Sequence, residues 1–168
     1  MNAIVAVSED FGIGREGGLL FPLREDMRYF RRRTLGKTLI IGRKTLDSFP
    51  GGRPLPNRRH IVFTRDPAFE REGVTVVHDL AELAEAVRDI PEEELFVAGG
   101  GQIYRLLLPY CRTLYVTRVK AQAEAEVFFP DLREDPSFRL MKRSAPLCEN
   151  GIRYYFCVYE RTDTPALL

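Results

Sequence analysis

The chain has no tryptophan and only two histidines and three cysteines among its 168 residues. The histidines, His60 and His78, have neither metal-ligand spacing nor a nucleophile–base pattern, so a metal centre or a hydrolase triad is not indicated. The cysteines, Cys111, Cys148 and Cys157, are odd in number and widely spaced. We therefore predict no metal site, no disulfide framework and a reducing compartment.

An excess of charge of one sign and a long apolar run are also lacking. The formal net charge is +1, which provides no global field for nucleic acid or an anionic membrane. No apolar stretch approaches the ~20 residues of a membrane span, and Glu9 and Asp10 interrupt the first one, unlike a signal peptide. No phosphate-binding loop of the G-x-x-x-x-G-K-[ST] type occurs. We expect a cytoplasmic protein with no nucleic-acid, membrane or obligate protein partner.

The organisation predicts one α/β domain over residues 1–168, because strand-like and helix-like segments alternate without a linker or repeat. Residues 9–23 are the exception, and we expect a loop too glycine-rich for a packed element. Asn150-Gly151 predicts a late hairpin, so the sheet should be mixed. Strands are expected at residues 4–7, 38–41, 60–63, 74–77, 95–98 and 114–119, followed by two segments around 138–141 and 153–159 with Asn150-Gly151 between them, and helices at 24–33, 43–48, 80–87 and from 102 onward.

Two strand ends have the composition of an anion site. The strand 95–98 stops at Gly99-Gly100-Gly101, and the strand 38–41 stops at Gly42 before Arg43, Lys44 and Thr45. Glycines allow close approach of the backbone to a ligand, and a helix start presents free N–H groups. A simple strand-ending turn explains each segment alone equally well. Arg43 and Arg65, both following strands, favour NADPH over NADH because a 2′-phosphate is bound by arginine.

Asp26 is the carboxylate that stands out. It shares a helix face with Tyr29 and Phe30 at i+3 and i+4. An acid in the first helical turn also has a purely structural explanation, since it complements the helix dipole. Against apolar walls, however, a carboxylate needs a partner such as the N–H-rich edge of a planar ligand, and partial desolvation should raise its pKa.

The motifs occur in a fixed order between Ile4 and Arg161. They are Ile13-Gly14, Asp26 with Phe30, Ile41-Gly42-Arg43-Lys44-Thr45 with Ser48-Phe49, Arg53-Pro54-Leu55-Pro56 with Arg58, Ala98-Gly99-Gly100-Gly101-Gln102-Ile103-Tyr104, and Leu114-Tyr115-Val116-Thr117-Arg118. In this order and spacing the chain resembles dihydrofolate reductases of the chromosomal bacterial type. The resemblance implies a three-layer α/β fold, with a central mixed and mostly parallel sheet, a C-terminal antiparallel hairpin and about four flanking helices.

The resemblance also implies site residues. Asp26 would be catalytic and bind the 2-amino and N3 edge of the pterin, with Thr117 bonded to it, while Arg58 would bind the α-carboxylate of the glutamate tail. The walls of the substrate pocket would be Ile4, Val5, Met27, Phe30, Phe49 and Leu55. The cofactor NADPH would contact Ala6, Ile13, Gly14, Leu19, Ala98 and Tyr104 around the nicotinamide, Gly42, Arg43, Lys44, Thr45, Gly100, Gly101, Gln102 and Ile103 along the pyrophosphate, and Arg43, Thr64 and Arg65 near the 2′-phosphate. The Gly99–Gly100 peptide would be cis.

The implied reaction is hydride transfer from NADPH to C6 of dihydrofolate with protonation of N5, which supplies tetrahydrofolate for one-carbon metabolism and is the target of antifolate inhibitors. Residues 9–23 would close over the nicotinamide. A monomer is expected. Two departures concern this region: Phe21 stands where the family usually has tryptophan, and Arg24 where it has proline. A related pyrimidine reductase and a non-catalytic NADPH- or folate-binding homologue remain as alternatives.

Overall fold

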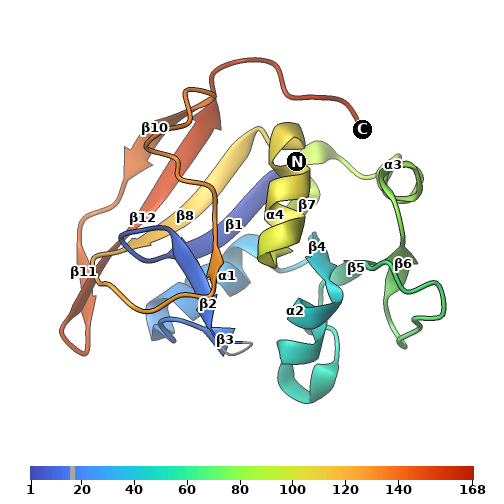
Figure 1. Ribbon diagram of the computed structural model, residues 1–168, viewed down its shortest axis with the longest axis horizontal. Coiled ribbons are helices and arrows are strands. Elements are labelled where there is room, and N and C mark those ends of the chain that lie inside the picture. The colour runs from blue at the N-terminus through green and yellow to red at the C-terminus, as the bar shows by residue number, and fades with distance from the viewer. Residues whose placement is uncertain (16–17) are drawn as a thin grey trace.

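A nine-stranded sheet forms the centre of the computed structural model, which describes residues 1–15 and 18–168 (Figure 1). Its strands are β1 (Asn2–Val7), β4 (Thr38–Gly42), β5 (Arg59–Phe63), β6 (Thr75–Val77), β7 (Leu95–Gly99), β8 (Thr113–Val119), β10 (Phe138–Arg143), β11 (Leu147–Glu149) and β12 (Ile152–Arg161). The order is β10-β12-β8-β1-β7-β4-β5-β6, and β11 pairs with β12. The strands from β8 to β6 are parallel, whereas β12 is antiparallel to β8 and β10.

Helices cover both faces of this sheet. The four α-helices of the described residues are α1 (Arg24–Thr34), α2 (Arg43–Ser48), α3 (Leu80–Val87) and α4 (Gly101–Leu107), and the 3-10 turns are η1 (Pro50–Gly52), η2 (Glu92–Glu94) and η3 (Leu108–Tyr110). Side chains alternate across a strand, so Leu39 and Ile41 of β4 pack with α1 and α2, whereas Ile40 packs with α3 and α4. Figure 1 shows α4 in front of the sheet and α1 behind it. The predicted three-layer, mostly parallel architecture is confirmed.

Local sequence signals account for several element boundaries. Asp79 caps α3 by accepting a hydrogen bond of 2.7 Å from the Glu82 backbone N–H. Asn150 and Gly151 have φ angles of 52° and 77° in the turn between β11 and β12, which confirms the predicted hairpin. The basic last turn of α1 complements the helix dipole.

The prediction that residues 9–23 hold no packed element is wrong. Within this segment β2 (Gly12–Arg15) pairs with β3 (Gly18–Leu19), and β2 also pairs with β9 (Val127–Phe128). Gly12 is buried, and a Cβ there would lie 2.5 Å from the Ala125 Cβ. Glycine therefore permits the close packing that we expected it to prevent. Gly17, which belonged to the expected loop, lies outside the described residues.

Candidate active site

Asp26 lies in the first turn of α1 and is held against the sheet. Its Oδ1 accepts a hydrogen bond of 2.6 Å from Thr117 Oγ1 on β8, and Thr117 is 2% exposed. Pairing of β8 with β1 sets Thr117 beside Ala6. Burial raises the pKa of Asp26 above its ordinary value of 3.8, and the Thr117 hydrogen bond only partly offsets this rise. The site therefore holds a half-buried carboxylate whose neutral form is favoured more than in water.

An apolar cluster includes residues of the same helix and of the strand beside Thr117. Tyr29, one turn after Asp26, stacks on Phe156 with ring centroids 4.1 Å apart, and Phe156 pairs with Thr117 across β12 and β8. Four of the expected wall residues belong to the same cluster: Ile4, Phe30, Phe49 and Leu55. Val5 packs in the cluster on the other face of the sheet, and Met27 is 56% exposed. A planar ligand edge at Asp26 would thus meet apolar side chains from α1, β1 and the segment after α2.

Arg58 lies in the turn between η1 and β5. Its Nε donates to the Pro56 carbonyl at 3.0 Å, and its Nη1 donates to Thr34 Oγ1 at 3.3 Å. Burial, followed by the nearby charge of Arg31, lowers the pKa of the Arg58 guanidinium. A bound carboxylate would compensate this unfavourable environment because it pairs with guanidinium through charge-assisted hydrogen bonds.

The glycine edge of the sheet lies where β4 and β7 end side by side. Ile41 of β4 pairs with Gly99 of β7, and the Gly99–Gly100 peptide is cis. The helices α2 and α4 begin at this edge, at Gly42 and Gly100, without a side-chain cap. Cβ atoms at Gly99 and Gly100 would lie 3.6 and 3.5 Å from Thr45 Oγ1. Because both residues lack a side chain, backbone N–H groups and a hydroxyl converge here.

The remaining residues assigned to the cofactor have mixed environments. Tyr104 is buried and its hydroxyl donates to the Ile4 carbonyl at 2.7 Å, which ties α4 to β1. Gly14 pairs with Leu19, whose side chain is 65% exposed. A Cβ at Gly101 would lie 2.4 Å from Val127 Cγ1, so glycine is required there by the approach of β9. Ala98 and Ile13 are half-buried, Ile103 is buried, and Gln102 is exposed.

Cations gather beside this edge, at the start of α2 and after β5. Arg43 Nη1 lies 3.2 Å from Asp66 Oδ2, and its guanidinium lies over the Phe69 ring at 4.7 Å. Lys44 and Arg65 are exposed, and Thr64 Oγ1 accepts a hydrogen bond from the Asp66 backbone N–H. Converging backbone N–H groups, a hydroxyl and cations fit a pyrophosphate and a phosphate monoester, so the residues present suit NADPH.

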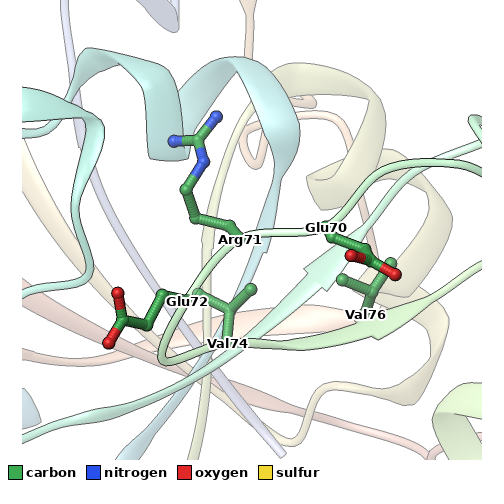
Figure 2. A pocket seen from close by; sticks show the side chains of 5 residues that line it. All are labelled: Glu70, Arg71, Glu72, Val74 and Val76. Atoms are coloured by element: carbon green, nitrogen blue, oxygen red, sulfur yellow. The ribbon is translucent and has the colours of Figure 1, made fainter.

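Two surface depressions lie away from Asp26. Figure 2 shows the first, of about 400 Å³, which is lined by Glu70, Arg71, Glu72, Val74 and Val76. Arg71 extends from it to α2, where its Nη2 lies 3.0 Å from Asp47 Oδ1. The second, of about 750 Å³, is lined by Asp10, Gln122, Ala123, Glu124, Ala125, Glu126 and Phe128. Neither depression is lined by Asp26 or Thr117, so neither is the candidate active site described above.

Two residues near the expected substrate side were not identified as functional from the sequence. Thr34 is buried at the end of α1 and contacts Arg58, and His60 is buried at the start of β5 and contacts the same turn. The only signal in the sequence for a role of His60 was its polar side chain at the first position of the otherwise apolar predicted strand 60–63. Among residues 1–15 and 18–168 no three His, Cys, Asp or Glu side chains form a group that could hold a metal ion, and no helix has the length and apolarity to cross a bilayer.

Comparisons with known proteins agree with this geometry. A sequence model of the family described as dihydrofolate reductase matches residues 1–161. The chain is 36% identical over 166 residues to the dihydrofolate reductase of Bacillus subtilis (strain 168), covering 98% of this chain and 96% of that protein. Identity to the Staphylococcus haemolyticus dihydrofolate reductase is 33% over 162 residues, covering 96% and 95%.

A solved structure supports the same assignment. The dihydrofolate reductase from Enterococcus faecalis complexed with NADP(H) and RAB-propyl superposes with a TM-score of 0.85 at 32% identity, covering 96% of each chain. The chain belongs to the dihydrofolate reductase family.

Proposed function

We propose that the protein is an NADPH-dependent dihydrofolate reductase that supplies tetrahydrofolate for one-carbon metabolism. The observation that carries the proposal is the Asp26–Thr117 pair, a half-buried carboxylate held in the apolar cluster of a chain that belongs to this family. When bound, NADPH supplies the hydride that C6 of dihydrofolate receives while N5 takes up a proton. Dihydrofolate, NADPH and antifolate inhibitors are the small molecules that the site should bind.

Asp26 orients the pterin. Its carboxylate accepts two parallel hydrogen bonds from the 2-amino group and N3, while Thr117 holds Oδ1 in place at 2.6 Å. The negative charge beside the ring stabilises the protonated pterin and so favours proton uptake at N5. A water molecule carries that proton, because Asp26, bonded to the 2-amino group and N3, does not reach N5.

Apolar side chains and one cation hold the rest of the substrate. Ile4, Phe30, Phe49 and Leu55 exclude water from the pterin and the ring that follows it. Arg58 binds the α-carboxylate of the glutamate tail. Met27, exposed on α1, covers the pterin from the solvent side, and Val5 contributes only backbone from β1, because its side chain packs on the other face of the sheet.

The glycine edge holds the cofactor. Gly42 and Gly100 allow the pyrophosphate to approach the backbone, Gly101 offers its backbone N–H at the start of α4, and Thr45 supplies a hydroxyl. Arg43, Thr64 and Arg65 bind the 2′-phosphate, and Lys44, Gln102 and Ile103 lie along the pyrophosphate. Ala6, Ile13, Gly14, Leu19, Ala98 and Tyr104 surround the nicotinamide, and the segment from Glu9 to Leu23 closes over it. We further infer one domain over residues 1–168 and a cytoplasmic monomer.

The test follows the absorbance of reduced nicotinamide with NADPH, with and without dihydrofolate, and again with NADH. Loss of absorbance that requires dihydrofolate and is faster with NADPH would support the proposal and the cofactor preference. Binding of NADPH without oxidation at saturating dihydrofolate would contradict it. Replacement of Phe21 by tryptophan would then ask whether the missing indole N–H is the cause.

A further inference from the structure

The imidazole of His60 links two backbone groups of one turn. His60 is 0% exposed, and its Nε2 accepts a hydrogen bond of 3.1 Å from the Leu55 backbone N–H. Its Nδ1 lies 3.1 Å from the Arg58 carbonyl oxygen. A carbonyl can only accept and a backbone N–H can only donate, so Nδ1 carries the proton and Nε2 does not. Only the neutral ring, in this tautomer, satisfies both partners.

The turn that His60 closes, from Leu55 to Arg58, carries Arg58, the cation assigned to the substrate tail. Asn57, inside the turn, has a φ angle of 59°, which non-glycine residues seldom adopt. Arg58 is held from two directions, by the Pro56 carbonyl and by Thr34 Oγ1, which in turn donates to the Phe30 carbonyl at 2.7 Å. Thr34 anchors the guanidinium to α1, and His60 anchors the backbone of the same residue to β5.

We propose that His60 is a positioning residue for the substrate tail: its ring fixes the turn from Leu55 to Arg58, so that the Arg58 guanidinium is preorganised for a carboxylate of the glutamate moiety. The inference rests on the proposed function, because that function places the tail at Arg58. His60 has no hydrogen bond to Asp26 or to the glycine edge, and it meets the pocket wall through the backbone N–H of Leu55 and the edge of the Phe49 ring. Its effect therefore falls on binding of the tail and leaves the chemical step unchanged.

This arrangement makes tail binding sensitive to acid. A second proton on Nε2 would point at the Leu55 N–H, so the hydrogen bond would be replaced by a repulsive contact. Burial lowers the pKa of His60 below its ordinary value of 6.5; the Arg58 carbonyl opposes this change, and the Arg58 charge adds to it. Protonation of His60 should therefore release the turn only at pH values below 6.5.

The groups packed around the ring add no other titrating partner. From the end of α2 comes the Phe49 ring, edge-on at 6.0 Å, and on β4 the paired residue is Leu39. Asp47 of α2 has its carboxylate between Arg43 and Arg71, and Thr34 of α1 is uncharged. Arg58 is the charged group that acts on His60 among these neighbours.

The experiment compares two substrates, dihydrofolate and a dihydropterin that lacks the p-aminobenzoylglutamate tail. In His60→Leu, KM for dihydrofolate should rise about tenfold, the upper end of the effect of losing one neutral hydrogen bond, with kcat unchanged. KM for the tailless substrate should not change. In His60→Gln, whose amide can accept from Leu55, KM for dihydrofolate should be partly restored.

The ratio of KM for the tailless substrate to KM for dihydrofolate, measured against pH, isolates the effect of protonating His60. Titration of Asp26 affects both substrates alike and cancels in this ratio. In the wild type, tail selectivity should decline below pH 6.5. In His60→Gln it should be independent of pH, while the matched control His78→Gln should behave as the wild type. His78 is the other histidine of the chain and bonds the Thr64 carbonyl, away from this turn.

Equal changes of both KM values in His60→Leu would overturn the inference, as would an acid decline that persists in His60→Gln. If His60→Leu fails to fold, as circular dichroism would show, the pH profile of His60→Gln decides alone. Failure of the proposed function is a separate outcome, in which the wild type reduces neither substrate. A wild type that reduces both with equal KM keeps the reductase and removes the role of His60.

Discussion

The two charged regions of the site differ in how firmly each charge is held. Asp26 is half-buried, has a hydrogen-bond partner in the sheet and lies on the same helix as Tyr29 and Phe30 of the apolar cluster. Arg43 is 45% exposed and is shared between Asp66 at 3.2 Å and Asp47 at 3.8 Å. The first is a fixed carboxylate in a region of low dielectric, and the second is a solvated cation with exchangeable partners.

The difference follows from the task of each group. A charge that must alter the protonation of a ligand is effective where water is scarce, since the interaction is then weakly screened. A charge that must accept a phosphate and later release it benefits from weak partners, because exposed ion pairs contribute little and exchange easily. The following predictions test this contrast.

Replacement of the fixed carboxylate should have the largest effect. Asp26→Asn should lower kcat/KM for dihydrofolate about 10²- to 10³-fold near neutral pH, the range typical of removing one preorganised group that stabilises charge in the transition state. The rate should recover partly in acid, where dihydrofolate is already protonated. The measurement is a pH profile of steady-state kinetics. The control is Glu25→Gln, which should resemble the wild type because Glu25 lies in the same helical turn but is exposed and paired with Arg28. Unchanged kinetics in Asp26→Asn would contradict the role assigned to Asp26.

Replacement of the exchangeable cation should affect the cofactor alone. Arg43→Gln should raise KM for NADPH about tenfold, because a charge-assisted hydrogen bond to the 2′-phosphate is lost, and should leave NADH unaffected. Arg71→Gln is the matched control, since Arg71 also lies over Phe69 and pairs with Asp47. Equal losses with NADPH and NADH would show that Arg43 does not read the 2′-phosphate.

The buried Asp26 carboxylate should also lower the free energy of unfolding. The folded pKa of Asp26 is raised, so between the unfolded value near 3.8 and the folded value the native state binds more protons, and stability falls as pH rises. Asp26→Asn should therefore raise the free energy of unfolding by about 1 kcal/mol at neutral pH, as replacements at functional sites often do. The gain should vanish at pH values below 3.8. Denaturant titrations at both pH values measure it, and a less stable variant at neutral pH would contradict the desolvation argument.

Salt should have the smallest effect, and it should act on cofactor binding at the exposed cations more than on the buried Asp26 carboxylate. Raising the ionic strength from about 0.01 to 0.15 M should increase KM for NADPH about twofold, because exposed charges are screened beyond the Debye length. The pKa of Asp26, followed by isotope-edited infrared spectroscopy, should hardly move. A salt-dependent shift of that pKa would show that the carboxylate is more solvated than its burial indicates.

The sequence predicted what local signals encode. Apolar runs of four or five residues marked the parallel strands, Asp79 and Asn150-Gly151 marked a cap and a turn, and glycines marked the edge at Gly42 and Gly99. The strands Gly12–Arg15 and Gly18–Leu19 were missed because β2, which pairs with β3, also pairs with β9, more than a hundred residues later. Short glycine-rich strands have no periodic signature of their own.

By itself, the sequence determined the order of the parallel strands and the α-helices, the helix face shared by Asp26 and Phe30, and the presence of cations after two strands, since each depends on neighbours within a few residues. Only the tertiary structure decided that Thr117 lies against Asp26, a contact across 91 positions, and that His60 links the backbone of Leu55 to that of Arg58. Burial and long-range hydrogen bonds set pKa values and tautomers, and these arise when the sheet brings distant segments together.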